Sequence, residues 1–315
     1  MKIAVLGAIC FDEIYDVDGN KTESFGGISY NIAALSSIAA TGETIVPVTK
    51  IGRDRHAPVM EMLARFSHLD TRAISVCDSP LTHVTLRWTS RDARQETILH
   101  KMPPFDAHDL LAANDADVAH FNFINGTELS LERLKQFRAD YKDLISVDVH
   151  QLISHFSEDG KRTLVGFSNW AEWMPHIDIV QCNELELQHT VGRTLTTRAD
   201  FLAAAKSLCS AGARIVAVTL GGEGALMVYQ DGETMRAVEA KPFQPENAIE
   251  TTGCGDSFSA GFLMGLVRHG DPLVAFASAI VVAGANAQRL GIGNLTDVSA
   301  QLREPLRHVR VVDVS

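Results

Sequence analysis

The 315-residue sequence lacks the features expected of a membrane-spanning or nucleic-acid-binding protein. It contains no run of about 18 apolar residues, so no segment is predicted to span a bilayer. Basic residues are outnumbered, because 28 Lys and Arg stand against 39 Asp and Glu and leave a formal net charge of −11. Proteins that bind nucleic acid or anionic membranes need a positive surface, so neither partner is expected.

Cysteine is also scarce and unpatterned. The five cysteines form no CxxC pair, which disfavours a disulfide scaffold or a structural zinc site and favours reduced thiols. The N-terminal MKIAVLGAIC lacks the small-residue cleavage site of a signal peptide and predicts a first strand instead. Together these features predict a cytoplasmic protein.

Several catalytic motifs are missing as well. The sequence has no GxxxxGK[ST] P-loop, no HExxH and no GxSxG, which excludes a Walker-type nucleotide site and disfavours zinc-protease or hydrolase chemistry. Gly7 follows the first predicted strand, but it lacks the companions of a GxGxxG turn. A nicotinamide-dependent oxidoreductase is therefore a weak alternative.

What the sequence does contain is an alternation of short apolar segments with amphipathic ones. The apolar segments predict strands at 3–6, 45–48, 118–123, 144–149, 177–181 and 215–220. The amphipathic segments predict helices at 28–40, 57–66, 131–139 and 197–211. Several strands are apolar without alternation, as is typical of parallel strands covered on both faces. The order predicts an α/β fold with a mainly parallel sheet, in a single domain over 1–315.

Two stretches interrupt this alternation. Between 71 and 100, apolar residues such as Val84, Leu86 and Trp88 alternate with polar ones, which predicts two or three antiparallel strands. With a further strand at 14–17, these segments predict a small β-sheet lid from about 11–22 and 72–102. Segments 226–229 and 234–238 are joined through Asp231-Gly232 and predict a β-hairpin.

The segment before an almost wholly apolar helix has the clearest chemistry. It has the sequence ETTGCGDSF from 250 to 258. Its glycines let a ligand approach the backbone, and the N–H groups and dipole of a helix N-terminus favour an anion such as phosphate. Asp256 would then lie beside the phosphate and could accept the proton of an incoming hydroxyl. The alternative is that Asp256 only complements the helix dipole and the glycines only form a turn.

Five short motifs, in this order, resemble those of the ribokinase/PfkB family of carbohydrate kinases. They are Gly26-Gly27 with Asn31, Ile51-Gly52-Arg53-Asp54, Asn183-Glu184-Leu185-Glu186, Thr219-Leu220-Gly221-Gly222-Glu223-Gly224, and the segment from Glu250 to Phe258. Each motif is short, but the resemblance that they carry covers residues 1 to about 291. The resemblance implies a ribokinase-like three-layer α/β/α fold with a mainly parallel central sheet and a small β-sheet lid.

The resemblance also implies roles for the matching residues. Asp256 would be the catalytic base, and the N–H groups of Gly253, Cys254 and Gly255 would hold the transferring phosphoryl group. The residues implied to hold substrate hydroxyls are Asp12, Gly26, Gly27 and Asn31. The residues implied to lie near ATP and Mg²⁺ are Asn183, Glu186 (through water), Thr219, Gly221 and Gly224. From the residues alone, Asn31 lies beside an apolar helical stripe and can equally be a buried amide with satisfied hydrogen bonds.

The sequence departs from the family pattern at three places. Cys254 replaces the usual Ala but offers the same N–H group. Glu250 replaces the usual Asp, in a region where many relatives bind a monovalent cation such as K⁺. Glu250 and Thr252 are the residues implied to hold that cation. The side chain of Glu250 is one methylene longer than that of the usual Asp. Asp148-Val149-His150 only partly resembles the family's D-x-N segment, so the role of His150 stays open.

We therefore expect an ATP- and Mg²⁺-dependent kinase that phosphorylates a hydroxymethyl group of a small sugar. The N-terminal site region offers no obvious basic pair to hold a second phosphate, which favours an unphosphorylated acceptor. The alternatives are a nucleoside kinase of the same family and a non-catalytic sugar- or nucleotide-binding regulator, against which the retained Asp256 argues. The apolar face of the lid needs covering, which predicts a homodimer through the lid.

Overall fold

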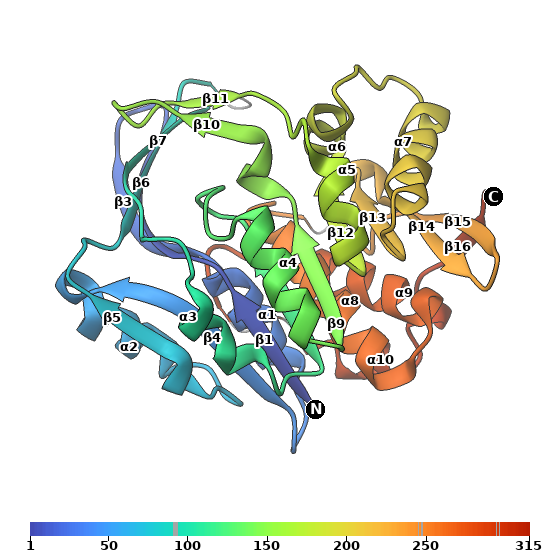
Figure 1. Cartoon of the computed structure of the whole chain (residues 1–315), viewed down its shortest axis with the longest axis horizontal. Coiled ribbons are helices and arrows are strands. Elements are labelled where there is room, and N and C mark those ends of the chain that lie inside the picture. Colours follow the sequence, from blue (N-terminus) through green and yellow to red (C-terminus); the bar gives the residue numbers. More distant parts are fainter. Residues whose placement is uncertain (91–93, 245, 247, 294, 296) are drawn as a thin grey trace.

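A ten-stranded sheet forms the centre of the computed structural model, which describes residues 1–90, 94–244, 246, 248–293, 295 and 297–315 (Figure 1). The strand order is β16-β15-β14-β13-β12-β9-β8-β1-β4-β5. These strands are β1 (Lys2–Leu6), β4 (Thr44–Gly52), β5 (Ile74–Cys77), β8 (Val118–Asn122), β9 (Leu144–Asp148), β12 (Ile179–Asn183), β13 (Ile215–Thr219), β14 (Ala225–Asp231), β15 (Thr234–Ala240) and β16 (Val311–Asp313). The strands from β5 to β13 pair in parallel, and β14 to β16 continue the sheet antiparallel.

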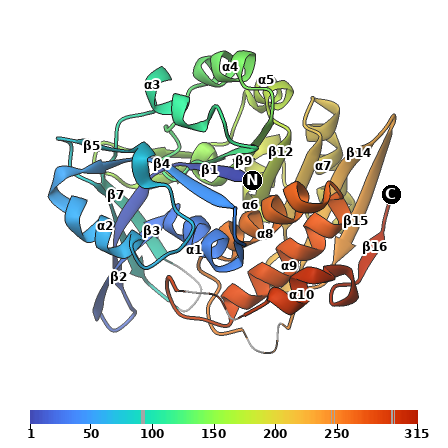
Figure 2. The ribbon, with the colours of Figure 1, turned by 90° about the horizontal axis from the view of Figure 1, so that it is seen from below.

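Helices cover both faces of this sheet, as the near-continuous apolar strands predict (Figures 1 and 2). One layer consists of α1 (Ser29–Ile38), α2 (His56–Leu63), α8 (Cys254–His269), α9 (Pro272–Ala287) and α10 (Ser299–Arg303). The other consists of α3 (Ala107–Leu110), α4 (Leu131–Asp140), α5 (Trp170–Trp173), α6 (Glu184–Val191) and α7 (Arg198–Ser210). Successive strand residues enter opposite cores: Ile3 and Val5 pack with α8, whereas Ala4 and Leu6 pack on the other face. The predicted three-layer α/β/α fold is confirmed.

A second sheet of four strands, the small sheet, lies at one end of the molecule. Its order is β3-β2-β6-β7, with β2 (Ile9–Tyr15), β3 (Lys21–Gly27), β6 (Thr82–Trp88) and β7 (Arg94–His100). A separate hairpin of β10 (Ser154–Phe156) and β11 (Arg162–Leu164) lies against its β7 edge (Figure 1). The contact includes the Ile98 N–H, which donates to the Gly160 carbonyl at 2.9 Å. The small sheet is thus attached both to the central sheet and to this hairpin.

The interval 72–102 predicted for the small sheet is wrong at its start. β5 pairs in parallel with β4 and belongs to the large sheet, because alternation in a sequence does not reveal which neighbour a strand joins. Residues 91–93 of the interval lie outside the described residues. The interval 11–22 is too short, since β2 and β3 occupy 9–15 and 21–27. The predicted hairpin is confirmed as β14–β15, turning at Gly232.

Within the described part of the chain, no helix combines the length and apolarity needed to cross a bilayer.

Candidate active site

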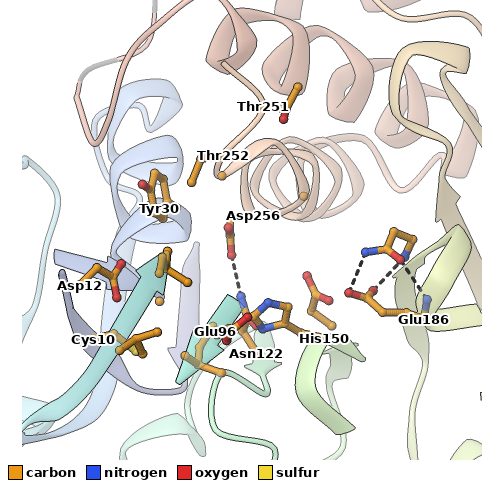
Figure 3. Close-up of a pocket in the computed structure, with 18 of the residues that line it drawn as sticks. Cys10, Asp12, Tyr30, Glu96, Asn122, His150, Glu186, Thr251, Thr252 and Asp256 are labelled. Atoms are coloured by element: carbon orange, nitrogen blue, oxygen red, sulfur yellow. Dashed lines mark hydrogen bonds between the residues drawn. The ribbon is translucent and has the colours of Figure 1, made fainter. Parts of the chain in front are cut away.

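A cavity of about 350 Å³ lies where the N-terminus of α8 meets the carboxyl ends of the central strands and one face of the small sheet (Figure 3). Its small-sheet side is lined by Cys10, Asp12, Val84, Leu86, Trp88 and Glu96. Its α6 side is lined by Asn183, Glu186 and Thr219. Asp256 lies between the two sides (Figure 3), and Gly253 and Gly255 also line the cavity. Carboxyl ends of parallel strands are the usual ligand site of such sheets.

Asp256 projects from the first turn of α8 toward the end of β8 (Figure 3). Its Oδ1 accepts a hydrogen bond of 2.7 Å from Nδ2 of Asn122. Burial raises the pKa of Asp256 to about 6, and the bond from Asn122 opposes that rise because it favours the charged form. A carboxylate that ionises close to neutral pH suits a general base.

The turn into α8 is shaped by Gly253, which has a φ of 76°. A Cβ at this position would lie 2.3 Å from the ring of Tyr30, so the turn needs glycine both for its backbone and for its packing. Gly253 and Gly255 line the cavity, as the anion-site prediction requires. The third predicted donor differs, because the Cys254 N–H donates to the Thr251 carbonyl at 3.2 Å and closes the turn. Cys254 instead contacts α9 through its sulfur and Asn286.

The predicted substrate residues fall into two groups. Asp12, on β2, and Gly27 line the cavity. Gly26 makes room for Asp12, since a Cβ on Gly26 would lie 2.0 Å from the Asp12 carboxylate. Asn31 is fully buried and is missing from the described cavity lining, so the structure places it as a buried amide with hydrogen-bond partners. Its Nδ2 donates to the Asp256 carbonyl at 3.2 Å.

The α6 side is organised by a capping box at the start of α6. The backbone N–H and side-chain Nδ2 of Asn183 each donate to the Glu186 carboxylate at 2.8 Å, and Asn183 Oδ1 accepts from the Glu186 N–H at 2.9 Å. Burial raises the pKa of Glu186 to about 7. Burial also raises the pKa of Asp148, with further contributions from Glu186 and Asp256.

The remaining predicted residues lie around this side. Thr219 ends β13 and lines the cavity, whereas Gly221 and Gly224 form the tight turn that follows it. Thr252 lines the cavity, and its carbonyl accepts from Asn286 at 2.8 Å. Glu250 accepts a hydrogen bond from the Gly291 N–H at 3.1 Å.

Sequence reasoning missed several cavity residues, among them Asn122, Glu96 and Gln181. Gln181 links two parts of the site, because its Nε2 donates to Asp148 at 3.1 Å and to the Gly255 carbonyl at 2.8 Å. Asn122 and Gln181 lie at or near the ends of predicted strands. Polar residues at the carboxyl ends of parallel strands often contact the ligand, and this was the signal that could have identified both residues. Glu96 comes from β7, and no short motif marks it.

The charge of the cavity is one-sided. Five carboxylates line it, those of Asp12, Glu96, Asp148, Glu186 and Asp256, and its described lining includes no Lys or Arg. Burial raises the pKa values of Asp148 and Glu186, and the neighbouring carboxylates raise them further. The site therefore favours ligands that bring cations or hydroxyl groups over ligands that bring uncompensated negative charge.

Residues 2–298 match the family model described as pfkB family carbohydrate kinase. The chain is 30% identical over 281 residues to the cytidine kinase of Thermococcus kodakarensis, covering 87% of this chain and 91% of that one. It is 30% identical to the 1-phosphofructokinase of Haemophilus influenzae over 120 residues, which cover only 38% and 37% of the two chains.

Solved structures show the same fold. The ribokinase of Thermotoga maritima aligns with a TM-score of 0.72 at 18% identity, over 97% of this chain and 99% of that one. A pyrophosphate-dependent kinase in the ribokinase family aligns with a TM-score of 0.74 at 18% identity, over the same shares. The chain has the ribokinase fold and belongs to the PfkB family of carbohydrate kinases.

Proposed function

We propose that this protein transfers the γ-phosphoryl group of ATP to a hydroxymethyl group of a small neutral sugar. Asp256 takes the hydroxyl proton, and the N-terminus of α8 stabilises the charge on the transferring group. The observation that carries the proposal is the position of Asp256, a buried carboxylate at a glycine-rich helix start, facing a cavity between the two predicted ligand sides.

The residues of the α6 side fit a requirement for Mg²⁺ with the nucleotide. Asp148 and Glu186 are acids whose pKa values are raised by burial, and a nearby cation would stabilise their ionised forms. Both Glu186 oxygens already accept from Asn183, so Glu186 would hold the ion through water. No described group of three or more acidic, His or Cys side chains forms a direct metal cage, which suits an ion bound mainly by phosphates. Mg²⁺ supplies charge neutralisation at those phosphates when it is bound.

The small-sheet side supports an unphosphorylated acceptor. Asp12 and Glu96 are hydrogen-bond acceptors that suit hydroxyl groups, and the described lining offers no cationic side chain to a second phosphate. The small sheet would act as a lid that keeps water from the phosphoryl group. A homodimer through this lid stays a prediction.

A nucleoside acceptor is the second candidate. Val84, Leu86 and Trp88 give the small-sheet side an apolar surface on which a nucleobase could stack. A relative that aligns over 91% of its own length, from Thermococcus kodakarensis, is a cytidine kinase, which favours the same candidate.

The test is phosphoryl transfer by the wild-type protein to free sugars, nucleosides and phosphorylated sugars. It is followed as ADP release with ATP as the donor and as orthophosphate release with pyrophosphate as the donor. The proposal expects turnover of a neutral sugar with Mg·ATP. Preference for a nucleoside would select the second candidate, and faster turnover of a phosphorylated sugar than of every neutral acceptor would contradict both. Turnover with pyrophosphate alone would contradict the assignment of ATP.

A further inference from the structure

A continuous network of polar side chains lies directly below Asp256. Asn122 and His120 are two residues apart on β8 and therefore point to the same face, toward α1 and α8. Asn31 on α1 and Ser146 on β9 complete the network. All four side chains are almost completely buried among the apolar residues of the core.

Asn122 bonds to the carboxylate in only one way. Its Nδ2 donates to Asp256 Oδ1 at 2.7 Å and to Asn31 Oδ1 at 3.0 Å. Turning the amide over would place its oxygen against two acceptor oxygens, so its orientation is fixed. In that orientation Asn122 Oδ1 is buried with no hydrogen-bond partner among the described residues.

That unpaired oxygen is informative. A buried acceptor without a partner costs stability, and an apolar side chain of similar shape would avoid this cost. That exchange would, however, leave Asn31 Oδ1 and Asp256 Oδ1 without the donor that Asn122 supplies. The two hydrogen bonds that the amide donates therefore account for an amide at position 122, and the shorter one is made to Asp256.

The rest of the network holds this amide in place. Asn31 Nδ2 donates to the Asp256 carbonyl and lies 3.5 Å from His120 Nε2. Burial lowers the pKa of His120 to about 4, so the ring is neutral at pH 7. With its proton on Nδ1, directed at Ser146 Oγ 3.1 Å away, His120 presents Nε2 as an acceptor to Asn31. Asn31 is then turned so that its Oδ1 faces Asn122.

We propose that Asn122 is a positioning residue that fixes the Asp256 carboxylate through Oδ1 and leaves Oδ2 to take the proton of the substrate. This inference rests on the proposed role of Asp256 as the base. A donor to Oδ1 also favours the ionised carboxylate, so Asn122 keeps the base active at a pH where its burial would otherwise protonate it.

The test is the pH dependence of kcat in Asn122→Leu, which keeps the approximate shape of the side chain and removes the donor. The acidic limb of the kcat profile should move to higher pH by about one unit, which is the scale of a charge-assisted hydrogen bond. At alkaline pH the kcat should recover toward wild type, with the KM for ATP unchanged. Equal loss at every pH, or an unmoved limb, would show a merely structural role and overturn the inference.

Asn125→Leu is the matched control. Asn125 is a buried amide three residues further along, and it also has an unpaired Oδ1 among the described residues, but its Nδ2 donates to Thr82 Oγ1 rather than to Asp256. Its acidic limb should stay where the wild type has it. If Asn122→Leu does not fold, Asn122→Asp preserves the shape while replacing the donor with a carboxyl group. Its limb should also move up, and an unmoved limb would again contradict the inference.

A second readout separates this inference from the proposed function. ¹³C NMR of protein labelled at the Asp carboxyl carbon, with the Asp256 resonance assigned through Asp256→Asn, measures the ionisation of Asp256 without turnover. If no acceptor is phosphorylated by the wild type, the proposed function fails. The inference still fails separately if the Asp256 titration is the same in wild type and in Asn122→Leu.

Discussion

The capping box on the α6 side of the cavity is built from neighbours in sequence, whereas the small-sheet side is assembled from distant segments. Asn183 and Glu186 are three residues apart and hold each other through a capping box. By contrast, Asp12, Val84 and Glu96 come from three strands that meet only in the folded sheet. The capping box therefore forms locally, while the small-sheet side depends on how the sheet is attached.

That attachment differs from the support of the α6 side. The α6 side follows directly from the ends of buried central strands. The small sheet is joined at its β7 edge to the β10–β11 hairpin, where Arg162 pairs with Glu96 at 3.4 Å. Gln151, in the short helix before that hairpin, donates to Glu96 at 3.0 Å. We infer that the α6 side serves phosphoryl transfer whichever acceptor is bound, and that the small-sheet side selects the acceptor.

Among the variants that distinguish the α6 side from the small-sheet side, Glu186→Gln should have the largest effect on activity. The amide keeps the size of the side chain but removes the charge proposed to hold Mg²⁺ through water, and loss of such outer ligands typically costs about 10–100-fold. We expect that loss in kcat, partly restored by excess Mg²⁺, with the acceptor KM unchanged. Glu184→Gln, on the exposed face of the same helix, is the control. An effect on the acceptor KM alone would contradict the division into two sides.

The pH profile of the wild type should show an effect of similar scale. Asp256 must be ionised to accept a proton, so activity is retained above its pKa of about 6 and lost as the pH falls through that value. Below the midpoint the rate should fall about tenfold per pH unit. Because Asp148 and Glu186 interact with Asp256, the midpoint belongs to the group of acids together. A rate independent of pH between 5 and 8 would contradict a carboxylate base.

Trp88→Ala should have the smallest effect, confined to the acceptor. Loss of an aromatic surface costs about 1 kcal/mol, which corresponds to about fivefold in the acceptor KM. The KM for ATP and the kcat should stay close to wild type. Thr85→Ala, on the opposite face of the same strand, is the matched control. A change in the KM for ATP instead would place the nucleotide on the small-sheet side.

The sequence predicted the α6 side better than the small-sheet side for a physical reason. Asn183 and Glu186 lie three residues apart in one short motif, so the family resemblance indicated both of them. Glu96 enters the site through strand pairing, which a single sequence does not specify. β5 was misassigned for the same reason. Asn122 ends a correctly predicted strand, but its importance comes from its hydrogen bond to Asp256, which lies 134 positions away in the sequence.

Asp256→Asn tests the central claim most directly, by initial ADP release at saturating acceptor and Mg·ATP. We predict a loss of about 10²–10⁴-fold, the usual contribution of a general base. The variant should fold at least as well as wild type at pH 7. Burial raises the pKa of Asp256 in the folded state, so the native carboxyl destabilises the fold as the pH rises from about 4 through 6, and the amide does not. A folded variant that keeps more than about a tenth of the wild-type rate would show that Asp256 is not the base.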